Sequence, residues 1–113
     1  MLHSVTPFFI VDDLGATLEF YQSRLGFNVL HKMLMFKHIA PEVHPQPNRS
    51  RHEWAAWDAY IFASDPGSLY AEFLARDVPM HRNPANTSDG PRAFEIADNN
   101  GYVLCFGRPV ERT

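Results

Sequence analysis

The fold is decided by residues 5–22, VTPFFIVDDLGATLEFYQ. Residues 5–11 are β-branched and aromatic, which is the composition of a buried strand. Asp12 or Asp13 can then cap a helix, because an Asp side chain accepts hydrogen bonds from the free amides at a helix N-terminus. The apolar residues that follow share one face at helical spacing: Leu14, Leu18, Tyr21 and Leu25. Gly26 supplies the stop. The chain therefore begins with a strand and a one-faced helix.

The same pattern returns about half a chain later. Residues 59–64, AYIFAS, form a short apolar run, and Asp65 can cap a helix with Pro66 at its first position, where the missing amide hydrogen costs nothing. The residues we expect this helix to bury are Leu69, Tyr70 and Phe73. A shift of 52 residues places Asp13 on Asp65. Two copies of one strand-helix unit would account for the whole length of the chain.

Further strands are expected after each helix. The candidates are residues 27–31, 33–39, 92–97 and 102–106. The last two are joined by Asp98, Asn99, Asn100 and Gly101, residues that tolerate positive φ and favour a hairpin turn. We expect Glu95, in this closing hairpin, to face solvent. Residues 40–58 hold several prolines, so they are predicted to form a loop without regular structure across the middle of the domain.

Composition excludes several classes of protein. The 113 residues suffice for one domain, and 45% hydrophobic and 13% aromatic content is typical of a globular chain. A formal charge of -3 with scattered Arg and Lys argues against nucleic acid as a partner. No apolar run approaches the length of a membrane helix. One cysteine forms no internal disulfide, and the N-terminus lacks the pattern of a signal peptide, so we expect a cytoplasmic protein with no membrane partner.

Three stretches together carry a family resemblance: TPFFIVDDLGATLEFYQSRLGF, DAYIFASDPGSLYAEFLARDV and PRAFEIADNNGYVLCFGRP. In this order they resemble the vicinal oxygen chelate superfamily, the glyoxalase, bleomycin resistance protein and extradiol dioxygenase group, with the metal-free bleomycin resistance branch nearest. The resemblance implies an α+β fold in which two βαβββ modules form curved mixed sheets around a cleft. Module one would span about 1–40, the central loop about 41–57 and module two about 58–113, within one domain.

The resemblance also implies an assembly. Members of this group usually form homodimers, and some exchange the N-terminal strand between subunits. Pro7 would suit such a strand, because proline has no amide hydrogen to donate and is confined to the edges of sheets. We therefore expect a homodimer and leave the exchange of the strand open.

Enzymatic members hold a divalent metal with His or Glu from the first strand of each module and Glu from the last strand. Carried across to this chain, those positions fall on Thr6, Ala59 and Cys105. None of them is a histidine or a carboxylate, so we expect no metal and no cofactor. The alternative is a rebuilt site in which His38 and Cys105 are joined by a histidine of the central loop, His44 or His52.

Two roles are considered for Cys105. It is a small buried filler of the strand, as free cysteines often are, or it is a nucleophile, which would need a neighbouring base or helix N-terminus to lower its pKa. We favour the filler and assign no catalytic residue.

Without a metal, the cleft becomes an apolar concave surface for a small molecule. Trp54, Trp57 and Tyr60 lie where the central loop enters residues 59–64, and their flat rings could stack on an aromatic ligand. The alternative is that both tryptophans pack a dimer contact or anchor the loop. The full set of expected ligand-binding residues is Thr6, Phe8, Phe36, His38, Trp54, Trp57, Tyr60, Val103 and Cys105.

The sequence thus leads to three hypotheses about function. The first is a metal-free dimeric protein that binds and sequesters a small, partly aromatic molecule, resembling the antibiotic-sequestering bleomycin resistance proteins. The second is a glyoxalase- or dioxygenase-like enzyme, a lyase, isomerase or oxygenase with a rearranged metal site. The third is a small dimerising domain that has no ligand. The absent ligand set favours the first.

Overall fold

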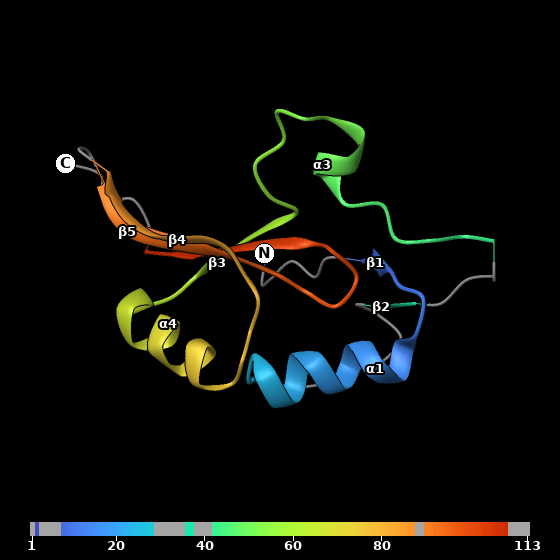
Figure 1. Cartoon of the computed structure of the whole chain (residues 1–113), viewed down its shortest axis with the longest axis horizontal. Coiled ribbons are helices and arrows are strands. Elements are labelled where there is room, and N and C mark those ends of the chain that lie inside the picture. The colour runs from blue at the N-terminus through green and yellow to red at the C-terminus, as the bar shows by residue number, and fades with distance from the viewer. Residues whose placement is uncertain (1, 3–7, 29–35, 38–41, 88–89, 109–113) are drawn as a thin grey trace.

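A four-stranded mixed sheet forms the centre of the structure, a computed structural model that describes residues 2, 8–28, 36–37, 42–87 and 90–108 (Figure 1). The strands lie in the order β3-β6-β5-β4, with β3 parallel to β6 and the other neighbours antiparallel. Their bounds are β3 Ala59–Phe62, β4 Met80–Thr87, β5 Gly90–Ala97 and β6 Val103–Gly107. The predicted hairpin of β5 and β6 is confirmed.

Helix α4 (Pro66–Ala75) connects β3 to β4. The Asp65 side chain accepts a hydrogen bond from the Ser68 amide at 3.2 Å, and Pro66 occupies the first turn, as the sequence predicts. The helix stops at Arg76, and Asp77 then takes a φ of 56° before the chain turns back into β4.

The first half of the chain contributes helix α1 (Leu14–Glu19), which continues as one π-helical segment, η1 (Phe20–Arg24). Asp13 is the cap, because its side chain accepts from the Ala16 amide at 3.0 Å. Gly26 ends the segment with a φ of 81°, a conformation that favours glycine. Strand β1 (Phe9–Ile10) pairs in parallel with β2 (Phe36–Lys37). The predicted helix is confirmed, and β1 covers two residues of the strand predicted over 5–11.

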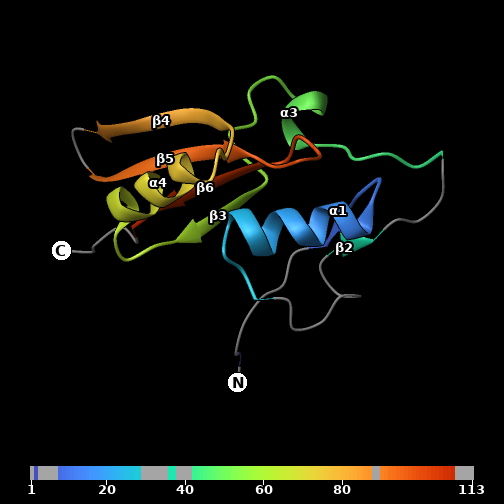
Figure 2. The same cartoon turned by 60° about the horizontal axis from the view of Figure 1, so that its bottom comes forward.

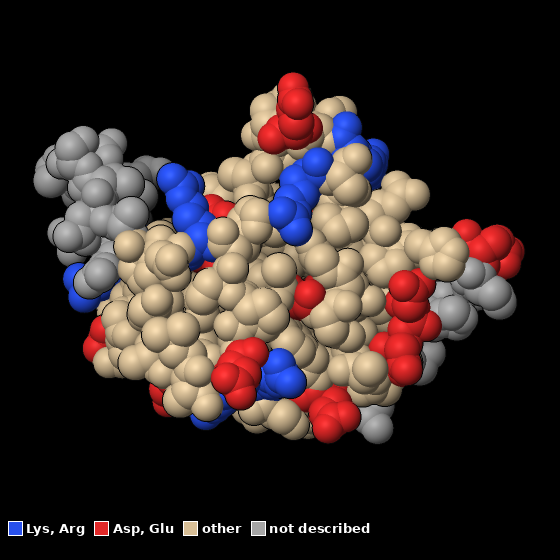
Figure 3. All heavy atoms as spheres, in the orientation of Figure 1, with Lys and Arg blue, Asp and Glu red and all other residues tan. Residues whose placement is uncertain are grey.

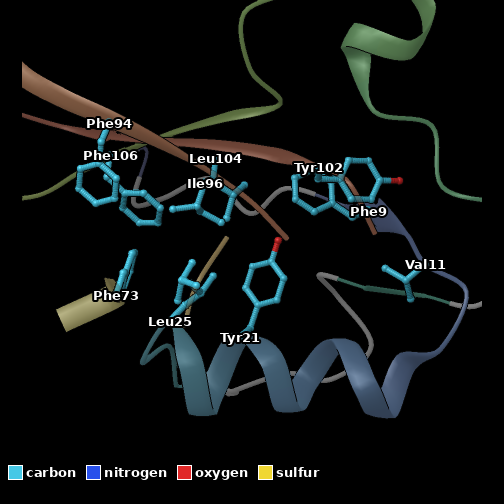
Figure 4. Packing of buried hydrophobic residues seen from close by; sticks show 11 residues of the cluster. Phe9, Val11, Tyr21, Leu25, Phe73, Phe94, Ile96, Tyr102, Leu104 and Phe106 are labelled. Atoms are coloured by element: carbon cyan, nitrogen blue, oxygen red, sulfur yellow. The ribbon is translucent and has the colours of Figure 1, made fainter. Parts of the chain in front are cut away.

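The hydrophobic core lies between the sheet and the two helices, which cover the same face (Figures 1 and 2). Phe73 of α4 meets the ring of Phe106 edge-on at 5.2 Å, and Phe94 stacks on Phe106 at 5.5 Å. Tyr21 points from η1 toward the sheet, where its hydroxyl donates to Asp98 at 2.6 Å (Figure 4). The first helix therefore docks onto the closing hairpin through both apolar contacts and a buried hydrogen bond.

One expectation about local structure is wrong, and one strand was not identified from the sequence. The central loop contains a short helix, α3 (Asn48–Arg51), because Pro45 and Pro47 precede the helix and so do not interrupt its hydrogen bonds. The residues of β4 were not among the strand candidates, although the resemblance to βαβββ modules implies three strands after the helix. The strand tolerates Pro84 because, among the residues that the structure describes, β4 lies at the edge of the sheet and one row of its amides has no strand partner.

The described residues contain one complete βαβββ module, made of β3, α4, β4, β5 and β6. The expected pair of modules is therefore shown only for the second half, and most of residues 29–41, where further strands are predicted, lies outside the described residues.

No helix in the described part of the chain is long and apolar enough to cross a membrane. Figure 3 shows Lys and Arg scattered over the visible face without a basic patch.

Candidate functional site

The two faces of the four-stranded sheet carry different residues. Strand register places Tyr60, Cys105, Glu95 and Arg82 opposite one another on four successive strands. We call these four residues the polar row. Because side chains alternate between faces along a strand, the polar row lies on the face away from α4, whereas the neighbours Phe94 and Phe106 face α4. Figure 1 shows α1 and α4 on one side of the sheet and α3 on the other.

A cavity of about 150 Å³ opens over the polar row. Its walls include Trp57, Tyr60, Arg82, Ala93, Glu95 and Cys105. We call this the sheet-face cavity. A cavity of roughly this volume, if lined by apolar side chains, accommodates a benzene ring. Trp57 and Tyr60 form an aromatic corner, with ring centroids 5.4 Å apart and planes at 61°.

Tyr60 contributes a ring and not a free hydroxyl to the cavity. Its hydroxyl donates to the main-chain oxygen of Arg108 at 3.1 Å. The ring passes over Gly107, where an added Cβ would clash with the tyrosine hydroxyl. The glycine is therefore what allows the ring to lie against the sheet.

Cys105 is almost fully enclosed, with 3% of its surface exposed. Burial and the neighbouring Glu95 carboxylate raise its pKa to about 11, against a smaller opposing effect of Arg82. The thiol is therefore protonated near neutral pH. Since the thiolate is both the nucleophile and the metal ligand, this environment favours the filler over the catalytic reading.

We expected Glu95 to face solvent, and this is wrong. Glu95 lies in the wall of the sheet-face cavity, with only 6% of its surface exposed. Its carboxylate has Arg82 Nη1 and His81 Nε2 at 3.8 Å, one beside each oxygen. A register shift between Met80 and Arg82 allows two successive residues of β4 to reach the same carboxylate. Glu95 pairs with Cys105 across the hairpin of β5 and β6, so both side chains lie on the same face. This pairing is the sequence signal that would have identified Glu95.

The expected metal positions do not converge among the described residues. Ala59 is opposite Leu104, so it faces α4, and the neighbour of Cys105 on β3 is Tyr60. Thr6 lies outside the described residues. In the described ranges, no group of three or more His, Cys, Asp or Glu side chains is arranged to hold a metal ion.

The histidines proposed for a rebuilt metal site are also separate from the cavity where they are described. His44 Nδ1 lies 3.0 Å from Asp12 Oδ1, and the ring of His52 lies 4.9 Å from that of Trp54. Neither histidine lines the sheet-face cavity. His38 lies outside the described residues.

The remaining predicted ligand-binding residues are spread over other parts of the molecule. Val103 lies on the same strand face as Cys105 but is buried and does not line the sheet-face cavity. Phe8 lines a different hollow beside β1, together with Asp58 and Tyr102. Trp54 is 79% exposed in the loop after α3. Phe36 lies in β2 and pairs with Phe9, and the structure describes its backbone but not its side chain.

The chain matches no protein-family model and no curated protein. Solved structures do share its fold. Over 96% of this chain and 100% of the other, it superposes on UcmS2 with a TM-score of 0.71 and 11% identity. TnmS3, an antibiotic binding protein from Streptomyces sp. CB03234, gives a TM-score of 0.68 and 21% identity, covering 96% of this chain and 98% of that protein.

A third structure is named for the whole group. It is a member of the glyoxalase/bleomycin resistance protein/dioxygenase superfamily from Sphaerobacter thermophilus, with a TM-score of 0.62 and 20% identity over 96% of this chain and 98% of that one. At these identities the likeness is one of fold. The chain therefore has the α+β fold of glyoxalase and bleomycin resistance proteins, and no branch of the group is distinguished.

Proposed function

We propose that this chain is a member of the glyoxalase and bleomycin resistance group that binds a small aromatic molecule in the sheet-face cavity without a metal. The observation that carries the proposal is the composition of the cavity wall. An aromatic corner stands beside a protonated thiol at the position where enzymatic members would place a metal-binding glutamate. Such a wall offers contact area and stacking, which are the usual means of holding a small apolar ligand.

The likeness to TnmS3 supports the proposal, since that protein is described as antibiotic binding. By extension, this chain would act by sequestration, and no catalytic residue is required. The cavity of about 150 Å³ would enclose one ring, and a larger guest would protrude from it.

In the described ranges, β3 lies at one edge of the sheet, and its Phe62 is 68% exposed. An exposed strand edge with an apolar side chain is a place where another chain can pair. We propose that the protein is a homodimer with a second βαβββ module in its first half. Light scattering of the purified protein tests the proposed dimer, and a monomer at all concentrations would contradict it.

Binding is tested by thermal shift against a panel of planar aromatic compounds, with and without divalent metals. A true ligand raises the melting temperature further as its concentration increases, and a tighter ligand raises it more at the same concentration. Trp57→Ala should weaken binding of any hit by about tenfold, because it removes one wall of the aromatic corner. Trp54→Ala is the matched control, since Trp54 does not line the cavity. Equal effects of the two substitutions would contradict the proposed site.

The alternative function is an enzyme with a rearranged metal site. Cys105 and Glu95, which are opposite each other in register, are the donors that favour it. Elemental analysis of protein purified without chelator or a metal-affinity tag separates the two functions. Stoichiometric bound metal would support the enzyme and contradict metal-free binding.

A further inference from the structure

The carboxylate of Glu95 is buried in the wall of the sheet-face cavity and accepts no hydrogen bond from the residues that the structure describes. We propose that Glu95 selects the guest by accepting a hydrogen bond from a neutral N–H or O–H group on an aromatic ring. This inference rests on the proposed function and names the class of molecule that the same cavity would take.

The lack of a donor among the described residues follows from the distances around Glu95. The nearest cationic or ring nitrogens, Arg82 Nη1 and His81 Nε2, lie at 3.8 Å, beyond hydrogen-bonding distance. In the described part of the chain, no hydrogen bond to either oxygen is found, and no fully enclosed side-chain oxygen or nitrogen lacks a partner. The oxygens of Glu95 are therefore reached from the cavity. A carboxylate in this position gains most when a guest supplies the missing donor.

The charges around Glu95 favour a neutral donor over a cation. Arg49 Nη1 lies 3.2 Å from His81 Nδ1, and since an arginine only donates, Nδ1 accepts and the ring proton lies on Nε2, facing Glu95. Arg82 balances the charge of the carboxylate. A cationic guest would meet Arg82 at the same carboxylate, whereas a neutral N–H or O–H group would complete the hydrogen bonding without a second positive charge.

The rest of the wall explains why the donor should be carried on a flat ring. Trp57 and Tyr60 present aromatic faces, and the Tyr60 hydroxyl is already engaged by Arg108. Of the described side chains that line the cavity, Glu95 alone carries a carboxylate. A bound ring would therefore lie against the aromatic corner with its one polar edge directed to Glu95.

Indole and benzofuran test the inference, because they have nearly the same shape and only indole carries a donor. Each is titrated into ¹⁵N-labelled wild-type protein and into Glu95→Gln, with dissociation constants taken from amide shift changes. We expect indole to bind wild type about tenfold more tightly than benzofuran, the worth of one net hydrogen bond to a charged group. In Glu95→Gln the ratio should fall to about threefold or less.

The outcomes separate this inference from the proposed function. Equal binding of the two probes to wild type would overturn the role of Glu95 and leave aromatic binding intact. Absence of binding by both probes, with no shifts at Tyr60 or Cys105, would overturn both. The ratio in wild type is decisive even if Glu95→Gln fails to fold, and the amide spectrum of the variant shows whether it has folded.

Discussion

The two faces of the four-stranded sheet are built from alternate residues of the same strands and differ in what they do. The face toward α4 is apolar and closed, with Phe94, Ile96 and Leu104 at 1% exposure or less. The face away from α4 carries the polar row and the sheet-face cavity. Adjacent residues of one strand therefore lie on opposite faces of the sheet. One face packs in the hydrophobic core, and the other is available to a ligand.

The buried carboxylates show the same division. Asp98, in the turn between β5 and β6, accepts from the Tyr21 hydroxyl at 2.6 Å and from the amides of Asn100 and Tyr102 at 2.8 and 2.9 Å. Glu95 accepts no hydrogen bond from the described residues and opens to the cavity. A carboxylate whose acceptors are filled by the protein is structural, and one whose acceptors are left unfilled is available for binding.

The largest effect should come from breaking the closed face. Phe106→Ala removes a ring that contacts both Phe73 and Phe94, so we expect a loss of about 3–5 kcal/mol in the free energy of unfolding, measured in urea. Cys105→Ala, next along the strand but on the other face, should cost only about 1 kcal/mol. Similar losses for the two variants would show that the faces do not differ in this way.

We expect the thiol of Cys105 to be alkylated slowly in the folded protein. Because burial raises its pKa from 9.0 to about 11, the thiolate fraction near pH 8 is lower by about 100-fold. We expect iodoacetamide to label the folded protein at least that much more slowly than the same protein in urea, and the native rate to rise up to about pH 11. Rapid native labelling at neutral pH would instead favour the nucleophile.

The sequence predicts the closed face better than the open one, for physical reasons. Helix caps at Asp13 and Asp65 and the turn before Tyr102 are local signals, and all three appear in the structure. Strand β4 was missed because its tolerance of Pro84 depends on its place at the sheet edge, which is a tertiary property.

The open face depends still more on tertiary geometry. Strand alternation alone places Cys105 on the face away from α4. Pairing with Cys105 places Glu95 on the same face, but its approach to Arg82 depends on the register shift in β4, which no local pattern predicts. Trp57 and Tyr60 were both expected near a ligand, and their binding role stays a prediction.

A smaller effect is expected where the open face is tightest. In Gly107→Ala the new Cβ would clash with the Tyr60 hydroxyl and lie 3.0 Å from the Cβ of Ala93. We expect a loss of about 1–3 kcal/mol and weaker binding of aromatic probes, because the Tyr60 ring must move. Gly67→Ala is the control, since its nearest contact is an ordinary 3.6 Å to Asp65. If Gly107→Ala left both stability and binding unchanged, the ring would not depend on the glycine.

The smallest effect, and the one that sharpens the contrast of the two carboxylates, is the pH dependence due to Asp98. Burial raises the pKa of Asp98 above its ordinary 3.8, and the hydrogen bonds from Tyr21, Asn100 and Tyr102 oppose that rise in part. The folded state therefore holds the proton more tightly than the unfolded chain. Its contribution to stability is full below about pH 3.8 and is lost as pH rises through the folded pKa.

Asp98→Asn removes this titration. Urea unfolding between pH 3 and 7 should therefore show wild type losing stability relative to Asp98→Asn as pH rises from about 4 and then levelling off. Tyr21→Phe removes a hydrogen bond that lowers the pKa of Asp98, so the same loss should extend to higher pH in that variant. A difference that instead grows in favour of wild type as pH rises would mean that the three hydrogen bonds outweigh burial, and Asp98 would then stabilise the closing turn as a charged group.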